Sequence, residues 1–181
     1  MLIVFAGLPG AGKSTIAKAL AARNALTYVR IDDIENALAR HVSPARQVGA
    51  EGYQVAYAVT LANLRLGNGV VADSVNPVRD SRQGWRHVAE QADVSLLEVE
   101  CICSDEAEHR RRVETRVSDM DGWRLPSWDE VLSRQYEPWE TDPLVIDTAS
   151  SSPEAAVREI EARITLAINQ RRLSSSLGDM S

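Results

Sequence analysis

The chain has 181 residues, of which 44% are hydrophobic and 25% charged, and its formal net charge is −6. These values indicate one soluble globular domain and exclude a disordered or fibrous chain. No apolar run reaches the roughly 18 residues that span a bilayer. The start of the chain lacks the basic segment of a signal peptide. The negative net charge argues against a protein that binds nucleic acid through bulk electrostatics.

Short apolar runs that end in turn residues alternate along the chain with segments of helical periodicity. The predicted strands are residues 2–6, 27–31, 70–73, 95–103 and 144–147. The predicted helices are residues 14–24, 33–39, 51–66, 77–92, 106–117, 128–136 and 153–171, with a loop at 41–50. Alternating strands and helices predict a single doubly wound α/β domain over residues 1–172, with helices on both faces of a parallel sheet. Residues 173–181 are predicted to form a flexible tail.

Some residue types are unusually rare in this chain. Cys101 and Cys103 are the only cysteines, and they do not form a disulfide framework, so a reducing cytoplasm is the expected location. Lys13 and Lys18 are the only lysines beside eighteen arginines, which makes both lysines candidates for a specific role. The histidines show no metal-ligand spacing, and His109, like the other two, is predicted to lie at the surface.

A glycine-rich segment follows the first predicted strand and opens the first helix. It matches the pattern G-x-x-x-x-G-K-[ST] in full, and its place between strand and helix argues against a turn without a ligand. The glycines let backbone N–H groups surround an anion, and the helix N-terminus adds positive charge. Lys13 would reach the β- and γ-phosphates of ATP, and the Ser14 hydroxyl would bind Mg²⁺. The predicted nucleotide-binding residues are Gly7, Leu8, Pro9, Gly10, Ala11, Gly12, Lys13, Ser14 and Thr15.

Features outside this loop favour a kinase over other nucleotide-binding proteins. The guanine-reading motif Asn-Lys-x-Asp is absent, and the chain is short for an ATPase motor. Asp32 and Asp33 follow the second predicted strand, at the sheet edge where ligands bind. A carboxylate there could accept the proton of an attacking hydroxyl, although either Asp could instead cap the next helix. Asp32 is the first choice for the catalytic base and Asp33 the second.

The third predicted strand also ends in polar residues. Asp73 could hold the magnesium ion from the side opposite Ser14, or it could simply end the strand. Asn76 could orient the substrate, or it could cap the helix that begins near Pro77. The sequence leaves both alternatives open.

One predicted helix is rich in arginine. Arg112 and Arg116 are four residues apart and are expected on the same face, where guanidinium groups could stabilise a transferring phosphoryl group. The alternative is a solvated helix with internal ion pairs to neighbouring glutamates. Residues 118–127, which contain glycine and proline, are predicted to form a mobile lid. Trp123 in this lid could close over an acceptor or pack beneath the loop.

Together these residues resemble the small P-loop kinases described as AAA-type predicted kinases. This group includes chloramphenicol phosphotransferase and the kinase domain of polynucleotide kinases, with shikimate and gluconate kinases as more distant relatives. The similarity extends over about residues 2–168. Its most specific parts are residues 7–15, 31–34, 71–76, 103–105 with 110–116, and 136–139.

The resemblance implies a P-loop NTPase fold with sheet order 2-3-1-4-5, ATP and Mg²⁺, and a hydroxyl acceptor. Asp32 matches the catalytic carboxylate, and Arg112 and Arg116 match the lid arginines. It also places the base-reading region near residues 148–153 and the acceptor pocket at residues 41–57 and the lid. Polynucleotide kinases have an arginine shortly after the catalytic Asp, and neither Glu35 nor Asn36 provides it.

The function that we expect is therefore ATP-dependent phosphorylation of a hydroxyl on a small molecule, such as an antibiotic, a sugar or a metabolite. One alternative is a kinase for nucleotides or polynucleotide 5′-hydroxyls, which the net charge disfavours. Another is a regulatory module that binds ATP without transferring phosphate. The sequence identifies neither the acceptor nor the oligomeric state.

Overall fold

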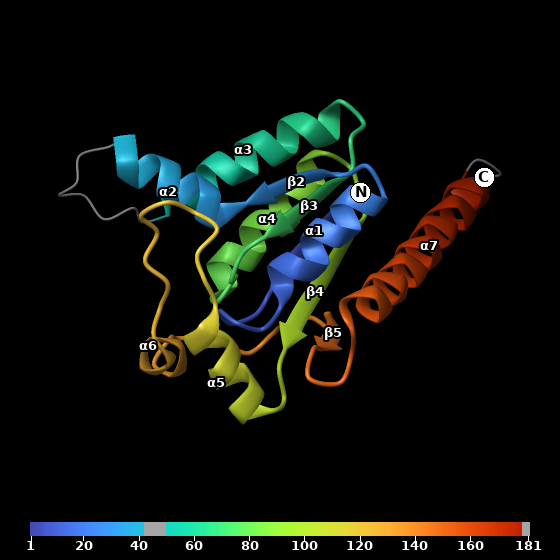
Figure 1. The fold of residues 1–181 in the computed structure, drawn as a ribbon. Helices are drawn as coiled ribbons and strands as arrows, with labels where there is room; N and C mark the ends of the chain where they lie inside the picture. Colours follow the sequence, from blue (N-terminus) through green and yellow to red (C-terminus); the bar gives the residue numbers. More distant parts are fainter. Residues whose placement is uncertain (42–49, 179–181) are drawn as a thin grey trace.

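Five parallel strands form one sheet in the predicted order, β2-β3-β1-β4-β5 (Figure 1). The computed structural model describes residues 1–41 and 50–178. The strands are β1 (Leu2–Ala6), β2 (Thr27–Arg30), β3 (Val70–Asp73), β4 (Leu96–Ile102) and β5 (Leu144–Asp147). The helices are α1 (Lys13–Arg23), α2 (Ile31–His41), α3 (Glu51–Arg65), α4 (Arg79–Gln91), α5 (Glu106–Thr115), α6 (Trp128–Leu132) and α7 (Pro153–Gly178).

The sheet is buried on both faces because helices cover each side. Side chains alternate across a strand, so Ile3 and Phe5 of β1 face α1 and α7. Leu2 and Val4 face the opposite way and pack with side chains of α3 and α4. This double burial explains why β1 is an unbroken apolar run rather than an alternating one.

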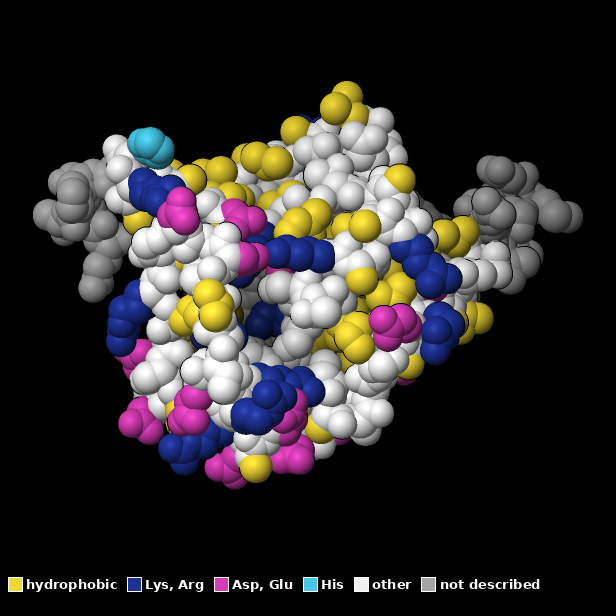
Figure 2. Space-filling model, viewed as in Figure 1, with side chains coloured by type: hydrophobic (Ala, Val, Ile, Leu, Met, Phe, Trp, Pro, Cys, Tyr) yellow, Lys and Arg dark blue, Asp and Glu magenta, His cyan; other side chains and the backbone are white. Residues whose placement is uncertain are grey.

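Parallel strands bring the chemistry-bearing segments to one edge of the sheet. The glycine-rich loop after β1, the start of α2 after β2 and Asp73 at the end of β3 all lie at the carboxyl ends of neighbouring strands. The long segment between α5 and α6 extends toward α2 across this edge (Figure 1). Figure 2 shows the same face hollowed near its centre, with Lys and Arg side chains visible in the hollow.

Several element boundaries differ from the prediction. Helix α2 begins at Ile31, so Asp32 and Asp33 lie in its first turn rather than before it. Helix α6 ends at Leu132, and α7 continues to Gly178, which makes most of the predicted tail helical. The predicted loop at 41–50 lies largely outside the described residues. Over residues 1–41 and 50–178, none of the helices has the length and apolar character that crossing a membrane requires.

Candidate active site

The glycine-rich loop wraps tightly because its glycines take conformations that other residues avoid. Gly7, Gly10 and Gly12 have φ angles of 131°, 85° and 88°. A Cβ atom at Gly7 would collide with the carbonyl oxygen of Cys101. From outside, His109 Nε2 lies 2.9 Å from the Pro9 carbonyl oxygen, and the ring is only 8% exposed. The prediction of a surface histidine is therefore wrong here, since His109 supports the loop.

Lys13 points into a cavity of about 990 Å³ that begins at this loop. Its side chain is buried, and its Nζ donates a hydrogen bond to the Leu8 carbonyl oxygen at 3.0 Å. Burial lowers the pKa of Lys13, while the negative charges of Asp73 and Asp32 oppose that shift. The ammonium group thus lies where phosphate oxygens could replace a single carbonyl partner.

Ser14 and Asp73, the two predicted magnesium ligands, line this same cavity. Asp73 is 2% exposed, and the Tyr28 hydroxyl donates a 2.6 Å hydrogen bond to its Oδ2. Oxygen donors of this kind suit Mg²⁺, which also takes several ligands from phosphates and water. The described residues contain no group of three or more His, Cys, Asp or Glu side chains able to hold a metal. As two oxygen-bearing side chains on one cavity wall, Ser14 and Asp73 would suit an ion that takes its other ligands from phosphate and water.

The structure separates the two aspartates that follow β2. Asp32 lines the cavity, and its side chain is 38% exposed. Asp33 is absent from the cavity wall and has an exposed side chain beside Arg30, with 3.5 Å between its Oδ1 and the Arg30 Nη1. Their position in the first turn of α2 explains the difference, because adjacent helical residues point about 100° apart. Of the two aspartates, only Asp32 lines the cavity.

Asn76 supports the fold rather than the cavity. It is fully buried, its Nδ2 donates to the Phe5 carbonyl oxygen at 2.8 Å, and its Oδ1 accepts from Trp85 Nε1 at 2.9 Å. Helix α4 begins only at Arg79, with Val78 as its N-cap. The predicted substrate contact and the predicted cap are both corrected, since the amide is used to join β1, β3 and α4.

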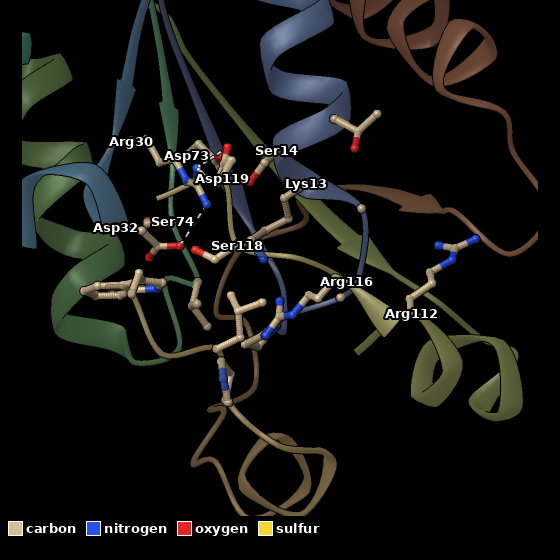
Figure 3. A pocket seen from close by; sticks show the side chains of 18 of the residues that line it. Lys13, Ser14, Arg30, Asp32, Asp73, Ser74, Arg112, Arg116, Ser118 and Asp119 are labelled. Atoms are coloured by element: carbon tan, nitrogen blue, oxygen red, sulfur yellow. Dashed lines mark hydrogen bonds and ion pairs between the residues drawn. The ribbon is translucent and has the colours of Figure 1, made fainter. Parts of the chain in front are cut away.

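Arg112 and Arg116 point in different directions, contrary to the prediction (Figure 3). Helix α5 ends at Thr115, so Arg116 is in an extended conformation and its side chain turns into the cavity. Its Nε and Nη2 are buried without a hydrogen-bond partner among the described residues. Burial lowers the pKa of Arg116, and the charge of Asp32 opposes this shift. Arg116 therefore offers unused donors in the cavity that Asp32 also lines.

Arg112 belongs to the opposite end of the cavity. It donates to Glu108, to the Thr148 hydroxyl at 2.8 Å and to the Thr148 carbonyl oxygen at 3.0 Å. Thr148, Ser151 and Pro153 line this end, which is the region where the family resemblance places the nucleotide base. Arg112 thus fastens α5 to the segment after β5.

A glutamate that the sequence analysis did not assign also faces the cavity. Glu35 lies one helical turn after Asp32 and packs its methylene groups against Gly52. Burial, together with the charge of Asp32, raises the pKa of Glu35 to about 7. Trp123, in the predicted lid, lines the cavity as well. The cavity lining therefore combines carboxylates with an aromatic ring.

The segment 136–139, part of the family resemblance, is anchored by a buried arginine. Arg82 is 2% exposed and donates to the carbonyl oxygens of Glu137 at 2.8 Å and Pro138 at 3.0 Å. Its guanidinium also lies over the rings of Trp139 and Tyr136, 4.2 and 5.1 Å from their centroids. This motif fixes the chain after the lid to α4 and has a structural role.

Most of the chain matches a known protein family. The family model described as AAA domain (AAA_33) matches residues 2–137. The chain belongs to this AAA domain family. A search of curated proteins finds no match.

Solved structures of other members of the P-loop kinase fold superpose over nearly the whole chain. A proposed kinase from Chloroflexus aurantiacus is 22% identical with a TM-score of 0.73, covering 92% of this chain and 96% of that one. Kti12 from Chaetomium thermophilum, in complex with ADP-AlF3, is 26% identical with a TM-score of 0.68, covering 93% and 99%. A gluconokinase from Sinorhizobium meliloti 1021 is 22% identical with a TM-score of 0.63, covering 95% and 96%. The AAA domain chain therefore has the fold of P-loop kinases.

Proposed function

We propose that the protein is an ATP-dependent kinase that transfers the γ-phosphate to a hydroxyl group of a small molecule. The observation that carries this proposal is the meeting of Lys13, Arg116 and Asp32 in one cavity (Figure 3). A buried ammonium, a guanidinium with unused donors and a carboxylate are the groups that phosphoryl transfer to a hydroxyl requires.

The residues suggest a simple sequence of events. The acceptor hydroxyl gives its proton to the Asp32 carboxylate, and its oxygen forms a bond to the γ-phosphorus. The bond from that phosphorus to the β–γ bridging oxygen breaks, and ADP leaves with the electron pair. Lys13 and Arg116 stabilise the negative charge on the phosphate oxygens. Ser14 and Asp73 would hold Mg²⁺, which when bound neutralises charge on the β- and γ-phosphates.

The relatives support the donor and the kind of acceptor. Kti12 binds an ADP complex, and the Sinorhizobium protein is a gluconokinase. The glycine-rich loop here is suited to the same type of nucleotide, and the acceptor side of the cavity offers Asp32, Glu35 and Trp123. Sugars, antibiotics and other hydroxylated metabolites fit this chemistry better than an extended polynucleotide, given the net charge of −6.

Phosphate transfer from γ-labelled ATP to a panel of acceptors tests the proposal. The panel contains aminoglycosides, phenicols, sugars, nucleosides and a 5′-hydroxyl oligonucleotide. Asp32→Asn should leave ATP affinity nearly unchanged and lower turnover by about 100-fold or more, the size typical of losing a general base. Lys13→Ala should weaken ATP binding itself.

Asp33→Asn is the matched control, because this neighbouring carboxylate is absent from the cavity wall. Its turnover should fall by less than about tenfold. Full turnover in Asp32→Asn would remove this residue from the mechanism. Tight ATP binding with no labelled acceptor in the wild type would instead favour a regulatory module.

A further inference from the structure

The lid carboxylate Asp119 is held from two elements of the domain body. Lys18 Nζ on α1 donates to Asp119 Oδ2 at 2.7 Å. Arg30 Nη1, at the end of β2, donates to both Asp119 oxygens at 2.9 and 3.0 Å. These hydrogen bonds lower the pKa of Asp119 to about 2. The structure therefore shows the lid lying against the body and fastened by charge.

Arg30 also faces the carboxylate proposed as the catalytic base. Its Nη2 lies 3.5 Å from Asp32 Oδ2, and Figure 3 shows the guanidinium between Asp32 and Asp119. The side chain of Arg30 is only 10% exposed, so water screens its charge weakly. Asp33 Oδ1 also lies 3.5 Å from Arg30, so that three carboxylates surround the guanidinium. Only Asp119 lies at the distance of a strong charged hydrogen bond.

Arg30 is thus shared between the lid carboxylate and the two carboxylates that follow β2, and this sharing has a chemical consequence. A guanidinium that hydrogen-bonds a carboxylate stabilises the charged form and makes it a poorer proton acceptor. With the lid in place, Arg30 is engaged by Asp119, and Asp32 keeps its oxygens available to an acceptor hydroxyl. Without the lid, Arg30 would lose its closest partner and pair more tightly with Asp32 and Asp33.

We propose that Arg30 is a positioning residue that couples lid closure to the catalytic carboxylate. Closing the lid engages Arg30 with Asp119 and releases Asp32 to accept the hydroxyl proton. The catalytic half of this inference rests on the proposed kinase activity, whereas the coupling itself does not. The other titratable or charged groups that face Asp32 are Lys13, Asp33, Glu35, Tyr53 and Arg116.

Coupling of this kind is reciprocal, which gives a test that needs no enzyme activity. If Arg30 is shared, removing the charge of Asp32 must strengthen the hydrogen bonds between Arg30 and Asp119, although Asp32 itself lies outside the lid. The lid supplies its own control in Asp121, a second carboxylate two residues further on. Asp121 is 96% exposed and lies 3.9 Å from Arg40, far beyond the length of a strong hydrogen bond.

Amide hydrogen exchange over residues 117–126, measured by mass spectrometry on the full chain, reports lid opening. Asp119→Asn should accelerate exchange about tenfold, and Asp121→Asn should change it by less than about twofold. Asp32→Asn should slow exchange by about threefold or more. Unchanged lid exchange in Asp32→Asn would overturn the coupling, whatever the activity of the protein. Thermal unfolding of each variant establishes that it is folded.

Turnover with the acceptor found in the panel tests the catalytic half. Asp119→Asn should lower kcat about tenfold and leave the KM for ATP within about twofold, because the phosphate-binding loop is untouched. Arg30→Lys should also lower kcat, since one ammonium cannot bridge two carboxylates as a planar guanidinium does. Faster lid exchange with unchanged kcat in Asp119→Asn would refute the release of Asp32. Absence of transfer in the wild type would reject the proposed function and leave the exchange result standing.

Discussion

Because the Glu35 carboxylate is largely buried, the free energy of unfolding of this protein should depend on pH. Its pKa is raised from 4.5 to about 7, chiefly by burial, and one pKa unit corresponds to about 1.4 kcal/mol. The full shift would cost about 3 kcal/mol, and water in the cavity reduces this to about 1–2 kcal/mol. As the pH rises from 4.5 to 7, Glu35 loses its proton in the unfolded chain before it does so in the folded protein. The free energy of unfolding therefore falls over this pH range, and the charged Glu35 destabilises the fold above it.

Glu35→Gln keeps the size of the side chain and its contact with Gly52 but removes the charge. Urea unfolding should therefore show a gain of about 1–2 kcal/mol for the variant at pH 8 and most of that gain lost at pH 4.5. Glu159→Gln, on an exposed position of α7, is the control and should change little at either pH. A gain of equal size at both pH values would refute the assignment of the effect to a buried charge.

Two further predictions follow from the polar contacts. Asn76→Ala should lower the free energy of unfolding by about 2–4 kcal/mol in urea titrations, because it removes the hydrogen bonds of the Asn76 amide to buried Trp85 Nε1 and the Phe5 carbonyl oxygen. A loss below about 0.5 kcal/mol would contradict the structural role of Asn76. In steady-state kinetics, Arg116→Ala should lower kcat about 100-fold with a small change in ATP affinity, whereas Arg112→Ala should mainly weaken ATP binding. Equal changes of kcat and ATP affinity in the two variants would contradict different roles for the two arginines.

The sequence predicts the sheet well because local and global signals agree in it. Strands β1, β3 and β5 are short apolar runs closed by glycine or aspartate, and the glycine-rich loop directly follows β1. Boundaries of helices are less well predicted, because tertiary contacts decide them. Helix α5 stops at Thr115, two residues before the predicted end, and Arg116 takes an extended conformation with its side chain in the cavity lining. Asn76 lies in the αL region, which its sequence neighbours do not signal.

The candidate site was predictable wherever a motif carries the chemistry. Lys13, Ser14 and Asp73 meet in the cavity because the loop and the end of β3 are adjacent in the sheet. Glu35 and Arg30 could not be assigned in this way, since their roles depend on what packs against them. Alternation along β2 could have placed Arg30 near the cavity, and helical spacing from Asp32 could have placed Glu35 there. Only the fold shows that Arg30 is buried next to Asp119 and that Glu35 packs against Gly52 of α3.

The two lysines supply local positive charge that a chain of net charge −6 would need in order to bind ATP as proposed. Both line the cavity, together with the five arginines Arg30, Arg112, Arg116, Arg124 and Arg134. The cations at the phosphate end are poorly screened, because Lys13 is buried and Arg116 is half-buried. Over the few ångströms that separate them from a bound phosphate, their field outweighs more distant surface carboxylates, which salt screens beyond about 8–10 Å. Net charge therefore argues against broad polyanion surfaces and leaves this enclosed site free to bind a nucleotide.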